Sequence, residues 1–345
     1  MYLIEGEIYN QYDALRCTYD YLRDQADAIR DFYASYAPRS ITFIGCGSGY
    51  CLCRSGAVSA SLRLGIPGYG MAAGDLLINF DQYRNMIEGT LLVAPSRSGG
   101  TSEVVMAVEK AKALGVKTLG IAAKEGSPLG EIADLCLEIP WAFDESVCQT
   151  RTVTNLYTAN LMLLGIIAED DGLLSEINSA ITVGNEYMEK YTPLAKEIAA
   201  QDWTKAVVLA DSELEGIADE AAIAVTEIAQ LPGTYHHVLD VRHGPMVLVD
   251  DSTLVIMFCS PAEITQQRRL VADLRGRGAK VVTISAQEDN LWDANWSVTI
   301  PSYHNFAVNG IPFIFIPQAI SYYKALERGV DPDRPSGLEP WIKLG

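Results

Sequence analysis

The feature that most constrains the fold of this chain is a set of short β-branched runs that occurs twice with almost the same spacing. Each run alternates with a stretch of helical periodicity, and this alternation favours parallel strands covered by helices. The runs lie at residues 41–44, 90–94, 118–121 and 135–139 in the first half of the chain and at residues 206–210, 253–258, 280–284 and 297–300 in the second.

The starts of successive runs are separated by nearly equal distances in the two halves. The first and second runs start 49 residues apart in the first half (41 to 90) and 47 in the second (206 to 253). The next intervals are 28 and 27 residues (90 to 118, 253 to 280), and the last is 17 in both halves (118 to 135, 280 to 297). This agreement predicts an α/β fold of two tandem doubly wound parallel-sheet units, each a flavodoxin-like three-layer αβα sandwich.

The repeat also sets the expected domain boundaries. A helical lead is expected at residues 1–35, the first unit at 36–170, the second at 195–330 and a proline-rich tail at 331–345. Ligands of doubly wound sheets lie beyond the carboxyl ends of the strands. The segments that follow each run are therefore where a functional site is expected.

The composition disfavours several classes of partner. The 345 residues carry a net charge of −18, so no basic surface for nucleic acid is expected, and an anionic membrane would repel the chain. No stretch reaches the roughly 20 apolar residues of a membrane span, and residues 1–7 do not resemble a signal peptide. The seven cysteines lack zinc-finger spacing, which favours free thiols in a reducing compartment. A cytoplasmic protein without a metal site is expected.

The first run ends in a glycine-rich turn, Gly45-Cys46-Gly47-Ser48-Gly49. Its Gly-x-Gly-x-Gly pattern departs from the Gly-x-Gly-x-x-Gly pattern of dinucleotide sites, and no acidic residue for a ribose follows about 20 residues later. Close packing between strand and helix explains these glycines as well as a ligand site does. The turn alone leaves both interpretations open.

The turn at residues 96–103 has the sequence Ser-Arg-Ser-Gly-Gly-Thr-Ser-Glu and precedes a helical pattern. Its glycines permit a tight turn, the free amides of the helix start point outward, and four hydroxyls lie within seven residues. These are the elements of an anion site that does not depend on net charge, and Arg97 could add a charge-assisted hydrogen bond. The alternative is an ordinary helix cap, which needs only one hydroxyl. We therefore predict a phosphate site here.

Two residues of the second half are candidates for acid–base chemistry. Glu227 lies late in a helix predicted over 214–231, where the helix dipole disfavours a carboxylate, although a solvent-facing position fits the sequence equally well. His243 belongs to a rigid His-Gly-Pro turn, for which a structural and a catalytic role are both open. Together they suit proton transfer in a sugar, with the carboxylate moving a proton between C1 and C2 and the histidine opening the ring.

The turn at residues 96–103, the turn at residues 45–48 and the segment Arg242-His243-Gly244-Pro245 together resemble the SIS (sugar isomerase) family of phosphosugar isomerases. Similar members of that family include the isomerase half of glucosamine-6-phosphate synthase, the tagatose-6-phosphate ketose/aldose isomerases (galactosamine-6-phosphate deaminases) and the fructosamine-6-phosphate deglycases. The resemblance covers residues from about 35 to about 335 and agrees with the two-copy architecture.

The resemblance implies roles for individual residues. Residues that match the family's phosphate ligands are Ser48, Ser96, Arg97, Ser98 and Thr101, and those in its sugar-binding segments are Gly47, Cys148 and Gln149. The family's catalytic glutamate precedes the histidine of its His-Gly-Pro segment by 16 residues, as Glu227 precedes His243 (227 to 243). In the family this histidine comes from the neighbouring subunit, so a homodimer with shared active sites is implied.

The chain departs from the family pattern at three positions. Arg97 stands where the synthase has glutamine, and Gly49 stands where serine is frequent. Pro340 stands where the synthase has a lysine that forms a Schiff base with a ketose, and Lys343 is a candidate substitute for that lysine. The glutaminase domain of the synthase is not part of this sequence, so glutamine-dependent amination is not expected.

The predicted function is that of a phosphosugar isomerase acting on an amino- or amine-substituted hexose 6-phosphate by enolisation at C1 and C2. Deamination and deglycation share this chemistry and differ in the leaving group, and neither is expected to need a cofactor. The alternative is a regulator of the same family that binds a sugar phosphate without converting it. Such regulators usually carry a DNA-binding domain, which the acidic composition disfavours.

Overall fold

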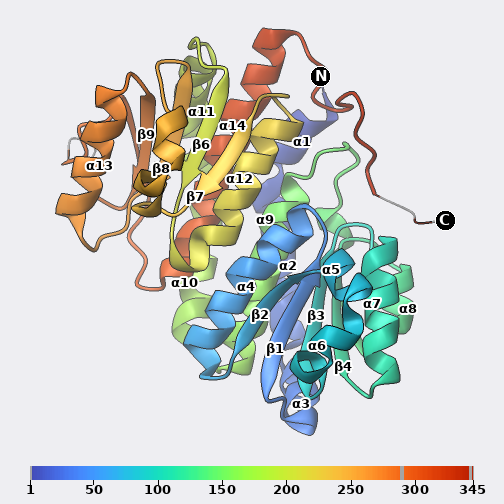
Figure 1. The fold of residues 1–345 in the computed structure, drawn as a ribbon. Coiled ribbons are helices and arrows are strands. Elements are labelled where there is room, and N and C mark those ends of the chain that lie inside the picture. Colours follow the sequence, from blue (N-terminus) through green and yellow to red (C-terminus); the bar gives the residue numbers. More distant parts are fainter. Residues whose placement is uncertain (1, 288–290, 342–343, 345) are drawn as a thin grey trace.

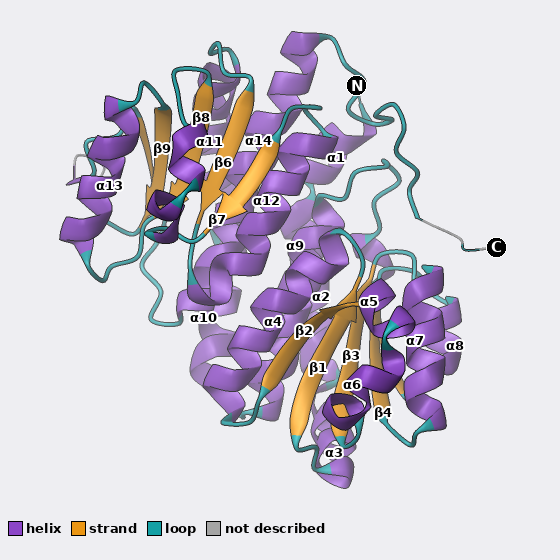
Figure 2. Ribbon diagram, viewed as in Figure 1, coloured by secondary structure: helices purple, strands orange, loops and turns teal. Residues whose placement is uncertain are grey.

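The computed structural model describes residues 2–287, 291–341 and 344. Within these residues each half of the chain forms one five-stranded parallel sheet (Figures 1 and 2). The first sheet contains β1 (Ser40–Gly45), β2 (Gly68–Ala72), β3 (Thr90–Ser96), β4 (Lys117–Ala122) and β5 (Leu135–Glu138). The second contains β6 (Lys205–Leu209), β7 (Gly233–His236), β8 (Thr253–Phe258), β9 (Lys280–Ser285) and β10 (Trp296–Thr299).

Both sheets have the same strand order. It is β2-β1-β3-β4-β5 in the first half and, read from the corresponding edge, β7-β6-β8-β9-β10 in the second. Every neighbouring pair of strands is parallel. The prediction of two tandem doubly wound units with a flavodoxin-like strand order is thus confirmed.

The helices form a central layer and two outer layers. Helices α4 and α9 of the first half and α12 and α14 of the second lie between the two sheets, whereas α5 to α8 and α13 cover the outer faces (Figure 2). Among the helices of the described residues, none has both the length and the apolar character needed to cross a membrane. The helices are α1 (Leu3–Tyr9), α2 (Gln11–Asp24), α3 (Ala26–Tyr36), α4 (Ser48–Leu64), α5 (Ala73–Ile78), α6 (Phe80–Ile87), α7 (Ser102–Ala113), α8 (Pro128–Ile132), α9 (Arg151–Ile167), α10 (Asp171–Thr182), α11 (Gly184–Ala199), α12 (Glu215–Glu227), α13 (Ile264–Gly276) and α14 (Gly310–Arg328).

The hydrophobic core is continuous between the two halves. Its largest cluster of buried side chains includes Leu156 and Leu163 of α9 together with Phe313 and Ile320 of α14. Side chains in such a core interdigitate at close to crystalline density, so one half cannot shift without disturbing the other. A site between the halves can therefore be built from both.

The edge strands β2 and β7 were not predicted by the hydrophobic pattern. Each begins with a glycine on which the preceding helix rests. A Cβ atom at Gly68 would lie 2.1 Å from the carbonyl oxygen of Ala57, and one at Gly233 would lie 2.2 Å from that of Ala222. The close approach of helix to strand requires glycine where a strand pattern would place a β-branched residue.

The two halves meet through α4 and α12, which occupy equivalent places in the repeat and pack against each other. Gly216 makes this contact possible, because a Cβ atom there would lie 2.0 Å from the carbonyl oxygen of Cys51. The hydroxyl oxygen of Ser55 accepts the N–H groups of Gly216 (3.1 Å) and Ile217 (3.2 Å). A side chain of the first half thus satisfies two of the free amides at the start of a helix of the second.

We predict that Gly216→Ala lowers the free energy of unfolding by about 1–3 kcal/mol, because the added methyl group forces two helix backbones apart. The matched control is Gly6→Ala in α1, where a Cβ atom would meet no atom within 4 Å. That control should raise stability by about 0.5–1 kcal/mol, since alanine is the better helix former. Denaturant titration followed by circular dichroism measures both. An unchanged Gly216→Ala midpoint would contradict the close contact.

Candidate functional site

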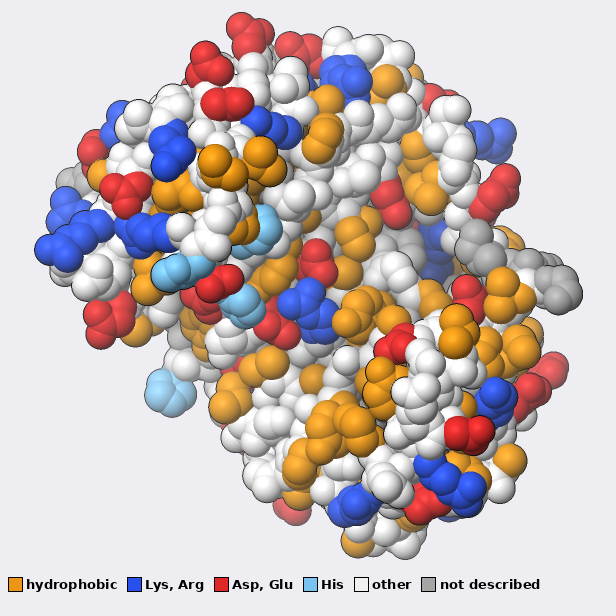
Figure 3. All heavy atoms as spheres, in the orientation of Figure 1, with side chains coloured by type: hydrophobic (Ala, Val, Ile, Leu, Met, Phe, Trp, Pro, Cys, Tyr) orange, Lys and Arg blue, Asp and Glu red, His pale blue; other side chains and the backbone are white. Residues whose placement is uncertain are grey.

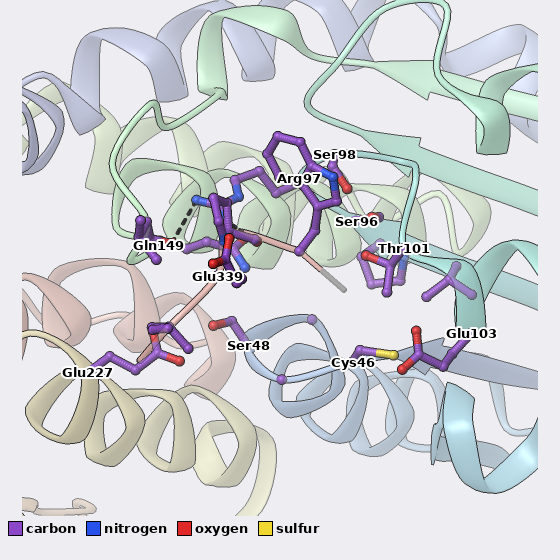
Figure 4. Close-up of a pocket in the computed structure, with 18 residues that line it drawn as sticks. Cys46, Ser48, Ser96, Arg97, Ser98, Thr101, Glu103, Gln149, Glu227 and Glu339 are labelled. Atoms are coloured by element: carbon purple, nitrogen blue, oxygen red, sulfur yellow. Dashed lines mark hydrogen bonds between the residues drawn. The ribbon is translucent and has the colours of Figure 1, made fainter. Parts of the chain in front are cut away.

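A cavity of about 160 Å³ lies beyond the carboxyl ends of β1 and β3, where the first half, the end of α12 and the C-terminal tail meet (Figure 4). This is the edge of the sheet at which the sequence predicts a ligand site. The predicted site residues that line the cavity are Gly47, Ser48, Ser96, Arg97, Ser98, Thr101, Gln149 and Glu227. Cys148 and His243 are not among the lining residues.

The turn between β3 and α7 has the geometry of an anion cradle. Gly99 has φ +57°, and a Cβ atom there would lie 2.2 Å from the hydroxyl oxygen of Ser127, so only glycine fits. The Ser96 hydroxyl oxygen accepts the N–H of Gly99 (3.0 Å) and thereby shapes the turn. Thr101 occupies the cap position of α7, yet its side chain makes no capping hydrogen bond in the described structure. Its hydroxyl is therefore not used as an ordinary helix cap.

The glycine-rich turn after β1 places a second helix start at the same cavity. Gly47, with φ +52° and ψ −128°, precedes α4, and Ser48 is the first residue of that helix. The starts of α4 and α7 both border the cavity. Free amides and the positive ends of two helix dipoles attract an anion without any basic side chain. A chain with a net charge of −18 can bind a phosphate in this way.

Arg97 is directed toward backbone carbonyls. Its Nη1 donates to the carbonyl oxygens of Ser146 (2.8 Å) and Val147 (3.0 Å), and its Nη2 donates to that of Pro340 (2.5 Å). Burial lowers the pKa of the guanidinium, and the nearby carboxyl of Asp144 opposes that decrease. The side chain thus joins the phosphate turn to a loop and to the tail. That Arg97 binds the phosphate itself stays a prediction.

Two buried carboxyl groups hold the loop that follows β5. The Asp144 carboxylate accepts the N–H groups of Thr150 (2.7 Å) and Thr152 (2.9 Å). Glu7 of α1 accepts the N–H of Ser146 (3.1 Å) and also bonds its hydroxyl. Burial raises the pKa of Asp144 to about 7, and the nearby Glu7 adds to the increase. Asp144 therefore holds the loop to the start of the helix that follows it, and Glu7 holds the loop to the N-terminal helix.

Glu227 is the last residue of α12, so the helix ends earlier than the predicted residue 231. Its carboxyl faces the cavity from the side opposite Arg97 and Gln149 (Figure 4). Burial raises the pKa of Glu227 to about 7, and the positive charge of Arg97 opposes the increase. Because both protonation states are accessible near neutral pH, this carboxyl suits a general acid–base role.

A second carboxyl, that of Glu220, lies behind the cavity and was not predicted. It is 1% exposed, and burial raises its pKa well above the usual range. The neighbouring Glu227 raises that pKa further, whereas a hydrogen bond with Ser48 lowers it. Glu220 and Glu227 are seven residues apart (220 to 227) and so share one helix face. That spacing is the sequence signal that could have identified Glu220.

The structure does not place His243 or Cys148 among the residues that line the cavity, although Val147 and Gln149, the neighbours of Cys148 in the chain, do line it. His243 is exposed at the end of a 3₁₀ turn, Asp240–His243. Cys148 is buried, and its carbonyl oxygen accepts the hydroxyl of Ser146 (2.8 Å). A single chain therefore does not supply His243 to the cavity that Glu227 lines.

The C-terminal tail contributes lining residues that no sequence pattern predicts, among them Glu339 and Trp341. The tail runs from the end of α14 past α1 to the first half of the chain (Figure 1). Near its end, the Leu344 N–H donates to the hydroxyl of Ser102 at the start of α7 (3.1 Å). Lys343, the candidate substitute for the synthase lysine, lies outside the described residues. Tertiary contacts alone set the course of this segment.

Glu103 also lines the cavity without having been predicted. It lies in the first turn of α7, beside Cys46 (Figure 4). An acidic residue in the first turn of a helix is favoured by the dipole, so its position had an ordinary structural explanation in the sequence.

A model of the SIS domain family matches residues 36–168 and 200–313, which is most of the chain. The chain belongs to the SIS domain family. Over 98% of its length it is 27% identical to a glutamine–fructose-6-phosphate aminotransferase (isomerizing) of Pyrobaculum aerophilum, of which it covers 57%. The chain spans about half the length of the curated relatives it matches.

Two solved SIS structures have the same fold as this chain. The tagatose-6-phosphate ketose/aldose isomerase of Escherichia coli has a TM-score of 0.87 at 22% identity, with 99% of this chain and 96% of that chain covered. The glucosamine-6-phosphate deaminase of Thermotoga maritima has a TM-score of 0.75 at 25% identity, with 95% and 99% covered. The resemblance inferred from the sequence is confirmed, and this SIS protein is related to phosphosugar isomerases and deaminases.

The pKa of Glu227 leads to a pH-dependent stability. Between its ordinary value of 4.5 and about 7, the folded chain holds more protons at this site than the unfolded chain, so rising pH destabilises the fold. Relative to Glu227→Gln, the wild type should lose up to about 3 kcal/mol of unfolding free energy between about pH 4 and about pH 8. Denaturant titrations of both proteins across this range measure the difference. The control Glu189→Gln, at an exposed position of α11, should follow the wild-type profile. A difference between wild type and Glu227→Gln that does not change with pH would refute the raised pKa.

The contacts of Arg97 predict a second measurable effect. In Arg97→Lys, a single ammonium group replaces the planar guanidinium. Lysine therefore cannot donate to the carbonyls of the loop and of the tail at the same time. Amide hydrogen exchange over residues 144–150 and 331–341 should accelerate about tenfold, as the loss of charged hydrogen bonds implies. Arg84→Lys, an exposed helix position, serves as the control. Unchanged exchange together with weaker phosphate binding would assign the guanidinium to the phosphate instead.

Proposed function

We propose that this SIS protein is an isomerase that acts on an amino- or amine-substituted hexose 6-phosphate and releases ammonia or an amine. The observation that carries the proposal is the position of Glu227. Its carboxyl has a pKa of about 7 and faces a cavity whose opposite part is an anion cradle of helix amides and hydroxyls. A phosphosugar held at that cradle presents its carbon chain to a group able to accept and return a proton.

In the proposed reaction, the amides and hydroxyls of the two turns bind the 6-phosphate, with Ser48, Ser96, Ser98 and Thr101 as the hydroxyl donors. Arg97 is proposed as a further phosphate ligand, and Gly47, Cys148 and Gln149 as contacts of the sugar. The Glu227 carboxylate takes a proton from one of the carbons C1 and C2 and returns it to the other. The resulting iminium carbon adds water, and the amine or ammonia leaves with the proton that water gives up.

This chemistry does not require a covalent bond between protein and sugar. Pro340 has no side-chain amine, and no lysine of the described residues lines the cavity. The carbonyl of Pro340 is also held by Arg97, which fixes the tail over the site. These features support deamination or deglycation by enolisation over a reaction through a Schiff base with a lysine of the tail.

The exposed face around His243 supports a homodimer with shared sites. Leu239, Val247 and Leu248 surround this histidine in the chain and are 43%, 77% and 71% exposed. Histidine and apolar side chains gather on the face shown in Figure 3, near the junction of the two halves. Large exposed apolar side chains in one region are typical of an interaction surface. We propose that this face contacts a second copy and that the partner subunit's His243 opens the sugar ring at each cavity.

The direct test is an assay for ammonia or amine release from glucosamine, galactosamine and fructosamine 6-phosphates. The wild type should convert at least one of them, and Glu227→Gln should lower kcat about 10²–10⁴-fold by removing the proton carrier. Glu189→Gln should retain full activity. Tight binding of a sugar phosphate without turnover of any substrate would instead favour a non-catalytic regulator.

The shared site is tested by mixing two inactive variants. If Glu227 and His243 act across subunits, an unfolded and refolded equal mixture of Glu227→Gln and His243→Ala should recover about a quarter of wild-type activity, because half of the dimers contain one intact site. Light scattering should report a dimer for each variant alone. A mixture as inactive as its components, although mixed dimers form, would show that Glu227 and His243 of the same subunit serve one cavity. Full activity of His243→Ala alone would remove His243 from the site.

A further inference from the structure

Among the described residues that line the cavity, acidic side chains outnumber basic ones. In Figure 4, Glu339 lies between Glu227 and Arg97, whereas Glu103 lies beside Cys46 at the other end. Arg97 is the one basic side chain among the lining residues that the structure describes. Its guanidinium already donates to three backbone carbonyls. The end of the cavity that carries Glu227 is therefore suited to a positively charged group.

We propose that Glu339 is a specificity-determining residue that binds the protonated amine of the substrate. The proposal rests on the proposed function of the same cavity and names the substrate class that this cavity prefers. Within the described residues, the Glu339 carboxylate has no hydrogen bond or ion pair of its own, although it lines the cavity. A carboxylate that faces a ligand site and has no partner in the protein can take an ammonium group of the ligand.

The backbone of the tail is held on both sides of Glu339, so this exposed side chain is kept at the edge of the cavity. On one side, the carbonyl of the next residue, Pro340, accepts a hydrogen bond from Arg97 (2.5 Å). On the other side, the carboxylate of Asp333 accepts the N–H groups of Leu3 (2.8 Å) and Ile4 (2.9 Å) at the start of α1. Binding of the ligand then needs to order only the Glu339 side chain and not the tail that carries it.

The charge pattern separates two kinds of phosphosugar. A neutral aldose or ketose phosphate would bring only hydroxyls to Glu227 and Glu339, and its dianionic phosphate would add to the negative charge of the cavity. An amino- or amine-substituted sugar phosphate brings a cation to that end and an anion to the helix starts. Its charges complement both ends of the cavity, so discrimination in favour of the amine is expected.

Two non-reacting open-chain ligands test the proposal by calorimetry. Glucitol 6-phosphate is neutral at C2, and 2-amino-2-deoxyglucitol 6-phosphate carries an ammonium group there. The wild type should bind the amino compound about tenfold more tightly or better, as a charge-assisted hydrogen bond implies. Glu339→Gln should abolish this preference and leave the affinity for glucitol 6-phosphate within about twofold, while Glu339→Asp should retain part of it. Glu125→Gln, exposed on the loop after β4, is the control.

The outcomes separate this inference from the proposed function. Equal affinity of the wild type for the two ligands, or a preference that survives in Glu339→Gln, overturns the role of Glu339 even if amino sugar phosphates are converted. A preference that disappears in Glu339→Gln and survives in Glu125→Gln supports that role even if the wild type converts no substrate, and the catalytic proposal then fails alone. Kinetics give a second readout, because Glu339→Gln should raise KM for the aminated substrate while kcat changes little.

Discussion

The contact between α4 and α12 is the constraint on which the candidate site depends. The two helices carry opposite parts of the cavity, with Ser48 at the start of α4 and Glu227 at the end of α12. Gly216 lets their backbones approach, and Ser55 supplies hydrogen bonds to the first amides of α12. Because equivalent helices of the two repeats pack on each other, an anion cradle of one half faces a carboxyl of the other. Neither half contains both.

The N-terminal helix and the C-terminal tail hold the segments that form the remaining sides of the cavity. Glu7 of the N-terminal helix bonds the loop at Ser146, and Asp333 of the tail bonds the first amides of that same helix. Arg97 connects the loop to the tail from within the cavity. Arg97 and Ser146, two of the residues that join these segments, are 49 residues apart in sequence, and the termini are more than 300 apart, so their meeting depends on the finished fold. The tail can thus serve as a wall of the site.

The repeat of strand spacings was sufficient to predict both sheets and the edge at which the cavity lies. The hydroxyl-rich turn was predicted because one helix cap does not need four hydroxyls. Glu227 stayed open on its own residue pattern and was favoured only by the resemblance to the SIS family. The strands β2 and β7 were not predicted because each begins with a glycine, Gly68 or Gly233, that close contact with a helix requires. Such a contact does not appear in the hydrophobic periodicity of the sequence. The hydrogen-bond partners of Arg97 and the course of the tail were not predicted either. Arg97 bonds backbone carbonyls, which every residue carries, so no pattern of residue types in the sequence indicates these bonds.

In the proposed function, backbone amides and hydroxyls bind most of the phosphate, which leaves the carboxyl groups of this acidic chain available for other roles. A phosphate dianion at the helix starts raises the pKa of Glu227 further, which would keep the carboxyl protonated when a base is needed. A substrate ammonium near Glu227 and Glu339 acts in the opposite direction and favours the carboxylate. Substrate binding and proton transfer are therefore coupled through charge. On this argument an aminated sugar phosphate prepares Glu227 to accept a proton, whereas a sugar phosphate without an amine does not.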